Sequence, residues 1–153
     1  MKNTKKQTFV YKAFGFPIKL INVPMKRVVG EWVIDVDFVA LEKAILRLLI
    51  HKRTPLSGAE LRFIRKFLEM TTTEFGKLFD VSHVAVLKWE GGKTRPPIST
   101  DIYIRLHVLD QLRVKDKEFR DVFDEAKAST LTRYKKKKPP LLSINIDEDL
   151  ESA

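Results

Sequence analysis

The stretch TTTEFGKLFDVSHVAVLKWE, residues 71–90, constrains the fold more than any other part of the chain. It contains two short helical patterns, over about residues 72–79 and 83–90, with only three residues between them. Thr71 and Glu74 have the spacing of a capping box, in which each side chain satisfies the backbone N–H of the other residue at the start of a helix. A connection as short as this one forces two helices to cross steeply. The stretch therefore predicts a helix-turn-helix arrangement.

The two predicted helices must pack closely, and several residues indicate how they do so. Gly76 leaves room where the second helix approaches, at a helix-propensity cost of roughly 1 kcal/mol relative to alanine. Val81 fills the turn, while Val86 and Trp89 face the body of the domain. Ser82 is a suitable N-cap for the second helix. The outer face of that helix then carries the remaining residues: His83, Val84, Leu87 and Lys88.

This outer face mixes cationic and apolar side chains, which is unusual for a helix that meets only water. In a helix-turn-helix, that face enters the major groove of DNA, with its N-terminal residues nearest the base edges. Lys88 can donate to guanine O6 and N7, and Val84 can pack on a thymine methyl group. His83 can donate to a base edge or to a phosphate. The pattern therefore favours sequence-specific DNA binding.

The charge of the chain suits such a partner. Its 29 lysine and arginine residues outnumber its 20 aspartate and glutamate residues, which gives a formal net charge of +9. An excess of this kind favours a polyanion, either nucleic acid or an anionic membrane surface. No apolar run approaches the roughly 18 residues that span a bilayer. The N-terminal sequence MKNTKKQTFVYKAFG also lacks the apolar core of a secretory signal. We therefore expect a cytoplasmic protein that does not enter a membrane.

The residue types that carry catalysis or bind metal ions are sparse. The chain has no cysteine, which excludes disulfides, thiolate metal sites and cysteine nucleophiles. A metal-dependent nuclease needs clustered carboxylates. Asp35 and Asp37 could point the same way on a strand, but no histidine lies near them in the sequence. We expect no enzyme activity, no cofactor and no bound metal.

Hydrophobic periodicity predicts the rest of the fold. Residues 8–38 have strand-like character, and helical spacing follows over residues 39–53. Further helices are expected over residues 56–70, from residue 99 or 100 onward, and over residues 115–134. In the helix that begins near residue 99, the residues expected to face inward are Ile102, Leu106 and Leu109. The expected fold class is α+β: a small β-rich N-terminal module followed by an all-α, five-helix-type helix-turn-helix DNA-binding domain.

Composition divides the chain into three parts. Residues 1–54 form the β-rich module with one helix, and residues 55–133 form the helix-turn-helix domain with its C-terminal helices. Residues 134–153 are predicted to be a flexible tail, first basic and then acidic. Arg133 and the basic run Lys135–Lys138 either add non-specific phosphate contacts or are a solvated terminal run. LLSINIDEDL, residues 141–150, either adds to the sheet of a partner, mimics nucleic acid or, as we expect, is disordered.

The stretch TTTEFGKLFDVSHVAVLKWEGGKTRPP resembles the helix-turn-helix of the phage-repressor and Cro type, known as the XRE family. The resemblance covers about residues 58–112. It rests on Thr72, Gly76, Val81, Ser82, Trp89, Glu90, Gly92, Lys93 and Pro96. The sequence departs from the family at Asp80, where glycine is usual, but aspartate tolerates the left-handed conformation that a tight turn needs.

This resemblance implies roles for individual residues. Thr72 corresponds to a position that holds a DNA phosphate, and the loop Gly91–Arg95 corresponds to one that passes along the DNA backbone. Arg65 and Glu90 correspond to a structural ion pair between the first and third helices of the domain. The DNA-binding residues that we expect are Thr72, Thr73, Ser82, His83, Val84, Leu87, Lys88, Lys93 and Arg95.

The sequence also resembles antitoxins of the MqsA and YgiT type. The similarity lies in LSGAELRFIRKFLEM and in two segments of the N-terminal module, YKAFGFPIKLINVP and VVGEWVIDVDFVALEKAI. Many members hold that module together with zinc bound by paired CxxC cysteines, which this chain lacks. The module is therefore expected to depend on an apolar cluster of Phe9, Tyr11, Phe14, Phe16, Trp32 and Ile34.

This second resemblance implies a type II antitoxin that represses its own operon as a homodimer and neutralises a cognate toxin, expected to be RNA-cleaving. Two-fold symmetric repressors read half-sites about 34 Å apart. A palindromic operator is therefore expected, with the dimer formed largely by the helices around residues 99–126. The alternative is a stand-alone XRE-family transcriptional regulator, in which the N-terminal module is a ligand sensor or a dimerisation element. A small toxin-like gene beside this one would favour the first function.

Overall fold

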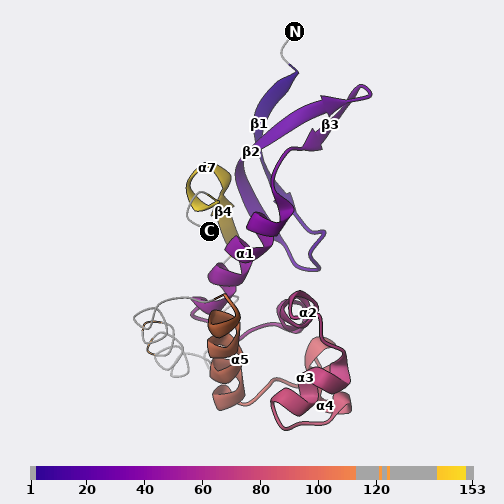
Figure 1. Ribbon diagram of the computed structural model, residues 1–153, viewed down its shortest axis with the longest axis vertical. Helices are drawn as coiled ribbons and strands as arrows, with labels where there is room; N and C mark the ends of the chain where they lie inside the picture. The colour runs from indigo at the N-terminus through magenta and orange to yellow at the C-terminus, as the bar shows by residue number, and fades with distance from the viewer. Residues whose placement is uncertain (1–2, 113–120, 122–123, 125–140, 151–153) are drawn as a thin grey trace. The chain divides into compact units, whose positions relative to one another are not determined.

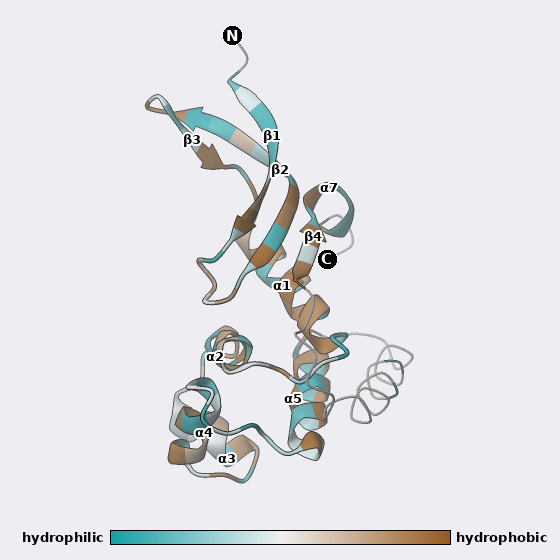
Figure 2. Cartoon of the chain, turned by 180° about the vertical axis from the view of Figure 1, so that it is seen from behind, coloured by the Kyte–Doolittle hydropathy of each residue, from teal (hydrophilic) through white to brown (hydrophobic). Residues whose placement is uncertain are grey.

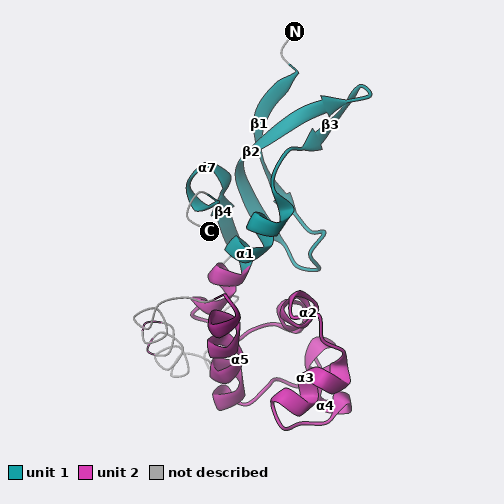
Figure 3. Cartoon of the chain, viewed as in Figure 1, with its two compact units in different colours: residues 1–45, 140–153 teal, residues 46–139 magenta. Residues whose placement is uncertain are grey.

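The computed structural model describes residues 3–112, 121, 124 and 141–150. In this part the chain is α+β, as the sequence predicts, with a four-stranded sheet and six helices. Two compact units can be distinguished, residues 1–45 with 140–153 and residues 46–139 (Figure 3). The division falls within the first helix, whereas the sequence places a boundary after residue 54.

Two sequence predictions lie outside this description. Apart from residues 121 and 124, the predicted helix over residues 115–134 is not among the described residues, and neither is the basic run Lys135–Lys138. Among the residues that are described, no helix is long and apolar enough to cross a membrane.

The first unit, residues 1–45 and 140–153, contains the sheet (Figure 1). Strand β1 (Thr4–Tyr11) pairs antiparallel with β2 (Ile18–Val28), and β2 pairs antiparallel with β3 (Glu31–Ile34). The last strand, β4 (Leu142–Asn145), pairs parallel with β2 and leads directly into the short helix α7 (Ile146–Asp149). Strand β2 therefore pairs with all three other strands.

The prediction of a flexible tail is wrong for residues 141–150. Ile144 and Ile146 are buried, and Lys6 Nζ on β1 lies 2.9 Å from the Asp147 carboxylate on α7. Apolar residues alternate with polar ones along this segment, which is the pattern of a strand with one buried face. The segment thus pairs with the sheet of its own chain.

The core of the first unit is aliphatic, not aromatic as predicted. Of the expected aromatic cluster only Phe16 is buried, while the other members are partly exposed. The rings of Phe9, Tyr11 and Phe14 instead make edge-on contacts with one another, with centroids 6.3 and 5.3 Å apart. The buried positions are Phe16, Ile18, Leu20, Val23, Met25, Leu41, Ala44, Ile45, Ile144 and Ile146.

The second unit, residues 46–139, is helical in its described part. It contains the last turns of α1 (Phe38–Ile50), followed by α2 (Gly58–Phe67), α3 (Thr72–Leu78), α4 (His83–Glu90) and α5 (Ile98–Gln111). The Phe79 ring, just after α3, contacts Phe75 on α3 and Tyr103 on α5, at centroid distances of 4.8 and 5.3 Å. Each of these helices contributes to the core, with Leu49, Leu61, Ile64, Phe75, Val86, Trp89, Ile104 and Val108 among the buried residues.

Helix α5 turns a different face inward from the one predicted. Ile102 and Leu106 are only partly buried, and of the three residues predicted to face inward only Leu109 is fully so. A charged pair takes the expected place: Arg105 Nε donates to Asp101 Oδ1 at 2.7 Å, and both side chains are buried. Charged residues at helical spacing normally indicate a solvated face, which is why the prediction of the inward face of α5 was wrong.

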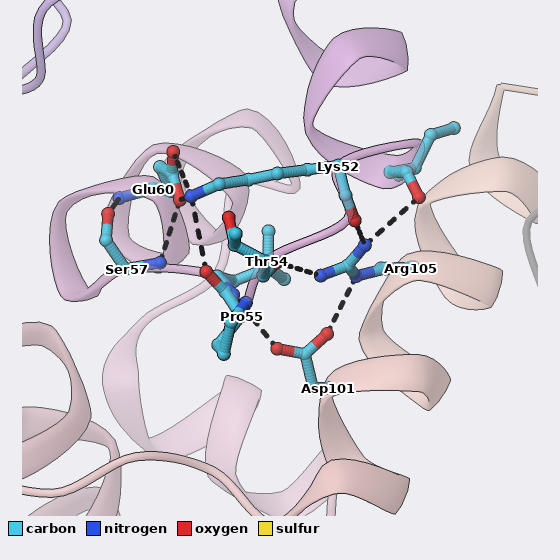
Figure 4. A network of polar contacts seen from close by, with 9 residues as sticks. Lys52, Thr54, Pro55, Ser57, Glu60, Asp101 and Arg105 are labelled. Atoms are coloured by element: carbon cyan, nitrogen blue, oxygen red, sulfur yellow. Dashed lines mark hydrogen bonds and ion pairs between the residues drawn. The ribbon is translucent and has the colours of Figure 1, made fainter. Parts of the chain in front are cut away.

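The Asp101–Arg105 pair ties α5 to the segment between α1 and α2 (Figure 4). Asp101 Oδ2 accepts the backbone N–H of Leu56 at 3.0 Å. The guanidinium of Arg105 donates to the carbonyl oxygens of Ile50, Lys52 and Thr54. These contacts satisfy the carbonyl of Ile50, the last residue of α1, and two carbonyls of the connection that follows.

A second buried ion pair fixes the start of α2 (Figure 4). Lys52 Nζ lies 2.6 Å from Glu60 Oε1 and also donates to the carbonyl of Pro55 at 3.2 Å. Glu60 accepts the backbone N–H of Ser57 at 2.8 Å, and Ser57 Oγ accepts the backbone N–H of Glu60, which completes a capping box. Because buried charges are costly unless paired and hydrogen-bonded, these groups hold the α1–α2 connection in one conformation.

Candidate nucleic-acid interface

Helices α3 and α4 form the closely spaced pair that the sequence predicts, and their starting caps are confirmed. Thr71 Oγ1 accepts the backbone N–H of Glu74 at 3.1 Å, while Glu74 accepts the backbone N–H of Thr71 at 3.0 Å. The hydrogen bond from the Thr71 backbone holds the pKa of Glu74 below its ordinary value. Ser82 Oγ accepts the backbone N–H of Ala85 at 3.2 Å and caps α4.

The turn between the two helices requires glycine at position 76. A Cβ at Gly76 would lie 2.5 Å from the carbonyl oxygen of Val81, closer than real Cβ contacts allow. The backbone N–H of Val81 donates to the Gly76 carbonyl at 2.8 Å. Asp80 has φ +57°, the left-handed conformation expected for it. The need for a small residue is therefore confirmed, although the group that approaches is the turn itself and not the second helix.

The end of α4 is held against the start of α2. A Cβ at Gly58 would lie 2.5 Å from the carbonyl oxygen of Trp89 and closer still to that of Glu90, so this contact also requires glycine. Sequence reasoning missed this contact, because Gly58 follows a capping serine and has the appearance of an ordinary helix start.

The predicted ion pair between Arg65 and Glu90 is present and bidentate. Arg65 Nε and Nη2 donate to the two Glu90 carboxylate oxygens at 2.7 and 2.9 Å, and Arg65 Nη1 donates to the Met70 carbonyl at 3.0 Å. The hydrogen bond to Glu90 raises the pKa of the Arg65 guanidinium. Together with the Gly58 contact, this pair fixes the C-terminal end of α4 on α2.

The outer face of α4 is exposed as predicted. Val84 and Leu87 are 46% and 54% exposed, large fractions for apolar side chains. His83 and Lys88 are exposed beside them, while Val86 and Trp89 are buried. Helix α4 thus carries hydrophilic and hydrophobic residues together (Figure 2). Its inward face anchors it, and its outward face is left for contact.

The other predicted contact residues flank this face along the chain. Thr72 is partly buried and Thr73 is exposed in the first turn of α3, and Ser82 is exposed although its hydroxyl caps α4. Lys93 and Arg95 are exposed in the loop that follows α4. In that loop Gly92 has φ +74°, and the Lys93 backbone N–H donates to the Lys88 carbonyl at 2.9 Å.

The site has the means to bind a ligand by hydrogen bonds, charge and apolar contact. Among the described residues, no group of three or more His, Cys, Asp or Glu residues is placed to hold a metal ion. Comparison of the chain with known protein families, with curated proteins and with solved structures found no match.

Proposed function

We propose that the second unit is a helix-turn-helix DNA-binding domain, and that the chain represses transcription as a homodimer. The observation that carries the proposal is the outer face of α4, where Val84 and Leu87 are about half-exposed between His83 and Lys88. An α-helix with its side chains is roughly 10–12 Å across, which matches the major groove of B-DNA at about 12 Å.

The side chains on this face suit the edges of base pairs. Lys88 can donate to guanine O6 and N7, and the methyl groups of Val84 and Leu87 can pack on thymine methyl groups. His83, in the first turn of α4, can donate to a base edge or a phosphate. The flanking hydroxyl groups and cations can bind the phosphates on either side of the groove. These residues are Thr72, Thr73, Ser82, Lys93 and Arg95.

Recognition requires that the reading helix be held in one orientation. With eight residues, α4 is shorter than the roughly 12–15 residues at which isolated helices become marginally stable. Its orientation therefore depends on its anchors, namely the buried side chains Val86 and Trp89 and the contacts of its last turn with α2. Because α4 is already fixed in the free protein, less conformational entropy is lost when it binds.

The antitoxin role rests on sequence resemblance alone. In that form of the proposal the chain represses its own operon through α4 and neutralises a toxin through the first unit. In the alternative, the first unit senses a ligand or braces a dimer in a stand-alone regulator. Purification of the tagged chain from its native host separates the two, since an antitoxin carries its toxin with it at fixed stoichiometry.

The DNA-binding proposal is tested by selection of bound duplexes from a random library with the full chain, followed by sequencing. We expect enrichment of a palindrome whose half-sites are about one helical turn apart. The same selection with Leu87→Asp, which puts a negative charge on the exposed face, should lose that enrichment. Equal enrichment by the variant, or no enrichment by the wild-type chain, would reject the proposal.

A further inference from the structure

The loop that joins β2 to β3 has an unusual conformation for its residues. Val28 pairs with Glu31, so Val29 and Gly30 form a two-residue turn, with φ of +49° and +81°. This type of hairpin turn favours asparagine or glycine at both positions. Val29 is β-branched and therefore strained in the left-handed region, yet it is 98% exposed. Folding alone would be served better by asparagine, so the exposed valine points to a contact with another molecule.

Cations lie on both faces of this hairpin. Arg27 pairs with Trp32, and the next residue back, Lys26, pairs with Val33. Because successive side chains in a strand point to opposite faces, Arg27 and Lys26 lie on opposite faces of the hairpin. Lys5 on β1 joins the Arg27 face, where its Nζ is 4.3 Å from the centroid of the Trp32 ring.

The cations on the Arg27 face are held in place, and within the described residues neither has an acidic partner. The Arg27 guanidinium lies 5.6 Å from the Trp32 centroid, and its Nε donates to the Gly30 carbonyl at 3.3 Å. No carboxylate in the described part of the chain pairs with Lys5 or Arg27. Lys26 on the other face has an exposed pair with Asp35 at 3.5 Å, so that face does not offer a free cation. Glu31, the acid nearest the turn, lies on that face too.

We propose that this hairpin tip is a second contact with duplex DNA, independent of the α4 face. The valines at its end would enter a groove, and Lys5 and Arg27 would meet the phosphates that border it. Apolar side chains inserted beside cations are a known means of binding DNA grooves. Duplex DNA offers both a groove for the valines and a row of phosphates beside it for these two cations.

The test compares two double variants that remove the same charge from the same unit. Lys5→Ala with Arg27→Ala removes the cations at Trp32, and Lys12→Ala with Lys43→Ala removes two exposed cations elsewhere. Affinity of the full chain for random-sequence duplex is measured against salt concentration. The first variant should flatten the log–log slope by about 1.8, or about 0.9 for each phosphate that is no longer neutralised. The control should retain the wild-type slope; an equal change in both variants, or in neither, would overturn the proposal.

Val29→Asn separates binding from folding. The substitution relieves the strained turn, so the thermal midpoint of unfolding should rise. With about half of the Val29 side chain buried against DNA in the complex, its loss should lower the affinity for duplex DNA roughly fivefold. A protein that is more stable but binds more weakly cannot be explained by unfolding. Unchanged affinity in this variant would count against the proposal.

This proposal and the function proposed for α4 can fail separately. If the hairpin variants keep the wild-type affinity and slope while Leu87→Asp loses operator selection, the hairpin does not bind DNA and the role of α4 stands. If no duplex binds the wild-type chain, both proposals fail. Loss of binding to anionic vesicles or to a co-purified protein, with DNA binding unchanged, would assign the tip to that partner instead.

Discussion

The tight contact between α2 and α4 predicts the effect of a single methyl group. In Gly58→Ala the new Cβ would meet the carbonyl oxygen of Trp89 at 2.5 Å, nearly an ångström inside an ordinary contact. Overpacking of this kind costs about 1–3 kcal/mol. Replacing glycine with alanine also reduces the entropy of the unfolded chain, which returns roughly 0.4–1 kcal/mol. Because the Cβ meets backbone atoms that cannot swing away, the cost lies in the upper half of that range, and we expect a net loss of about 1–2 kcal/mol in the free energy of unfolding.

Urea unfolding measures this loss directly. Tryptophan fluorescence in a Trp32→Phe background reports on Trp89 alone, because the chain has two tryptophans. Gly91→Ala is the matched control, since its Cβ would lie 3.3 Å from the nearest atom and should cost less than half as much. Because the shift moves the last turn of α4, Gly58→Ala should also weaken operator binding more than non-specific binding. Wild-type stability in Gly58→Ala would refute this packing of α4 on α2.

Three other substitutions test separate contacts. Lys88→Ala should weaken operator binding by about 1–3 kcal/mol in a titration, with folding intact. The control Lys43→Ala should keep the wild-type affinity. Unchanged operator affinity in Lys88→Ala would contradict the docking of α4. Arg105→Ala removes the cation that pairs with the buried Asp101 carboxylate, so urea unfolding should show a loss of about 3–5 kcal/mol in the free energy of unfolding; a loss of only about 1 kcal/mol or less would show that this ion pair is dispensable. The lowered pKa of Glu74 means that its bonds to Thr71 contribute stability above the ordinary carboxyl pKa, which is lost as pH falls through the lowered value. Glu74→Gln should therefore show a shallower decline of thermal midpoint in acid, and a decline equal to that of the wild type would argue against this bond.

The sequence predicts the α3–α4 pair well because the signals there are local. The capping residues, the glycine in α3 and the apolar spacing of α4 all act within a few residues of one another, so their structure follows from short-range rules. The ion pair of Arg65 with Glu90 was expected only through a family resemblance, because no periodicity connects residues so far apart.

The parts that the sequence did not predict depend on distant partners. Strand β4 pairs with β2 more than a hundred residues away, and its acidic continuation looks like a solvated tail until Lys6 is placed beside it. Asp101 and Arg105 have the spacing of a solvent-facing pair, and nothing in the sequence shows that Arg105 meets the carbonyl groups of the α1–α2 connection. In the first unit, an apolar, mainly aromatic cluster was expected in place of a zinc site, but aliphatic residues of the strands and of α1 fill the core.

The most direct test of the central claim is a titration of the isotope-labelled chain with its selected duplex, followed by amide chemical shifts. The largest changes should fall on the exposed residues of α4, His83, Val84, Leu87 and Lys88, and on the loop that follows. With the Lys88→Ala variant, the same α4 changes should require a higher concentration of the selected duplex. If DNA binds while the amide chemical shifts of α4 stay unchanged, α4 is not the helix that contacts the bases, and the function proposed for this domain is wrong.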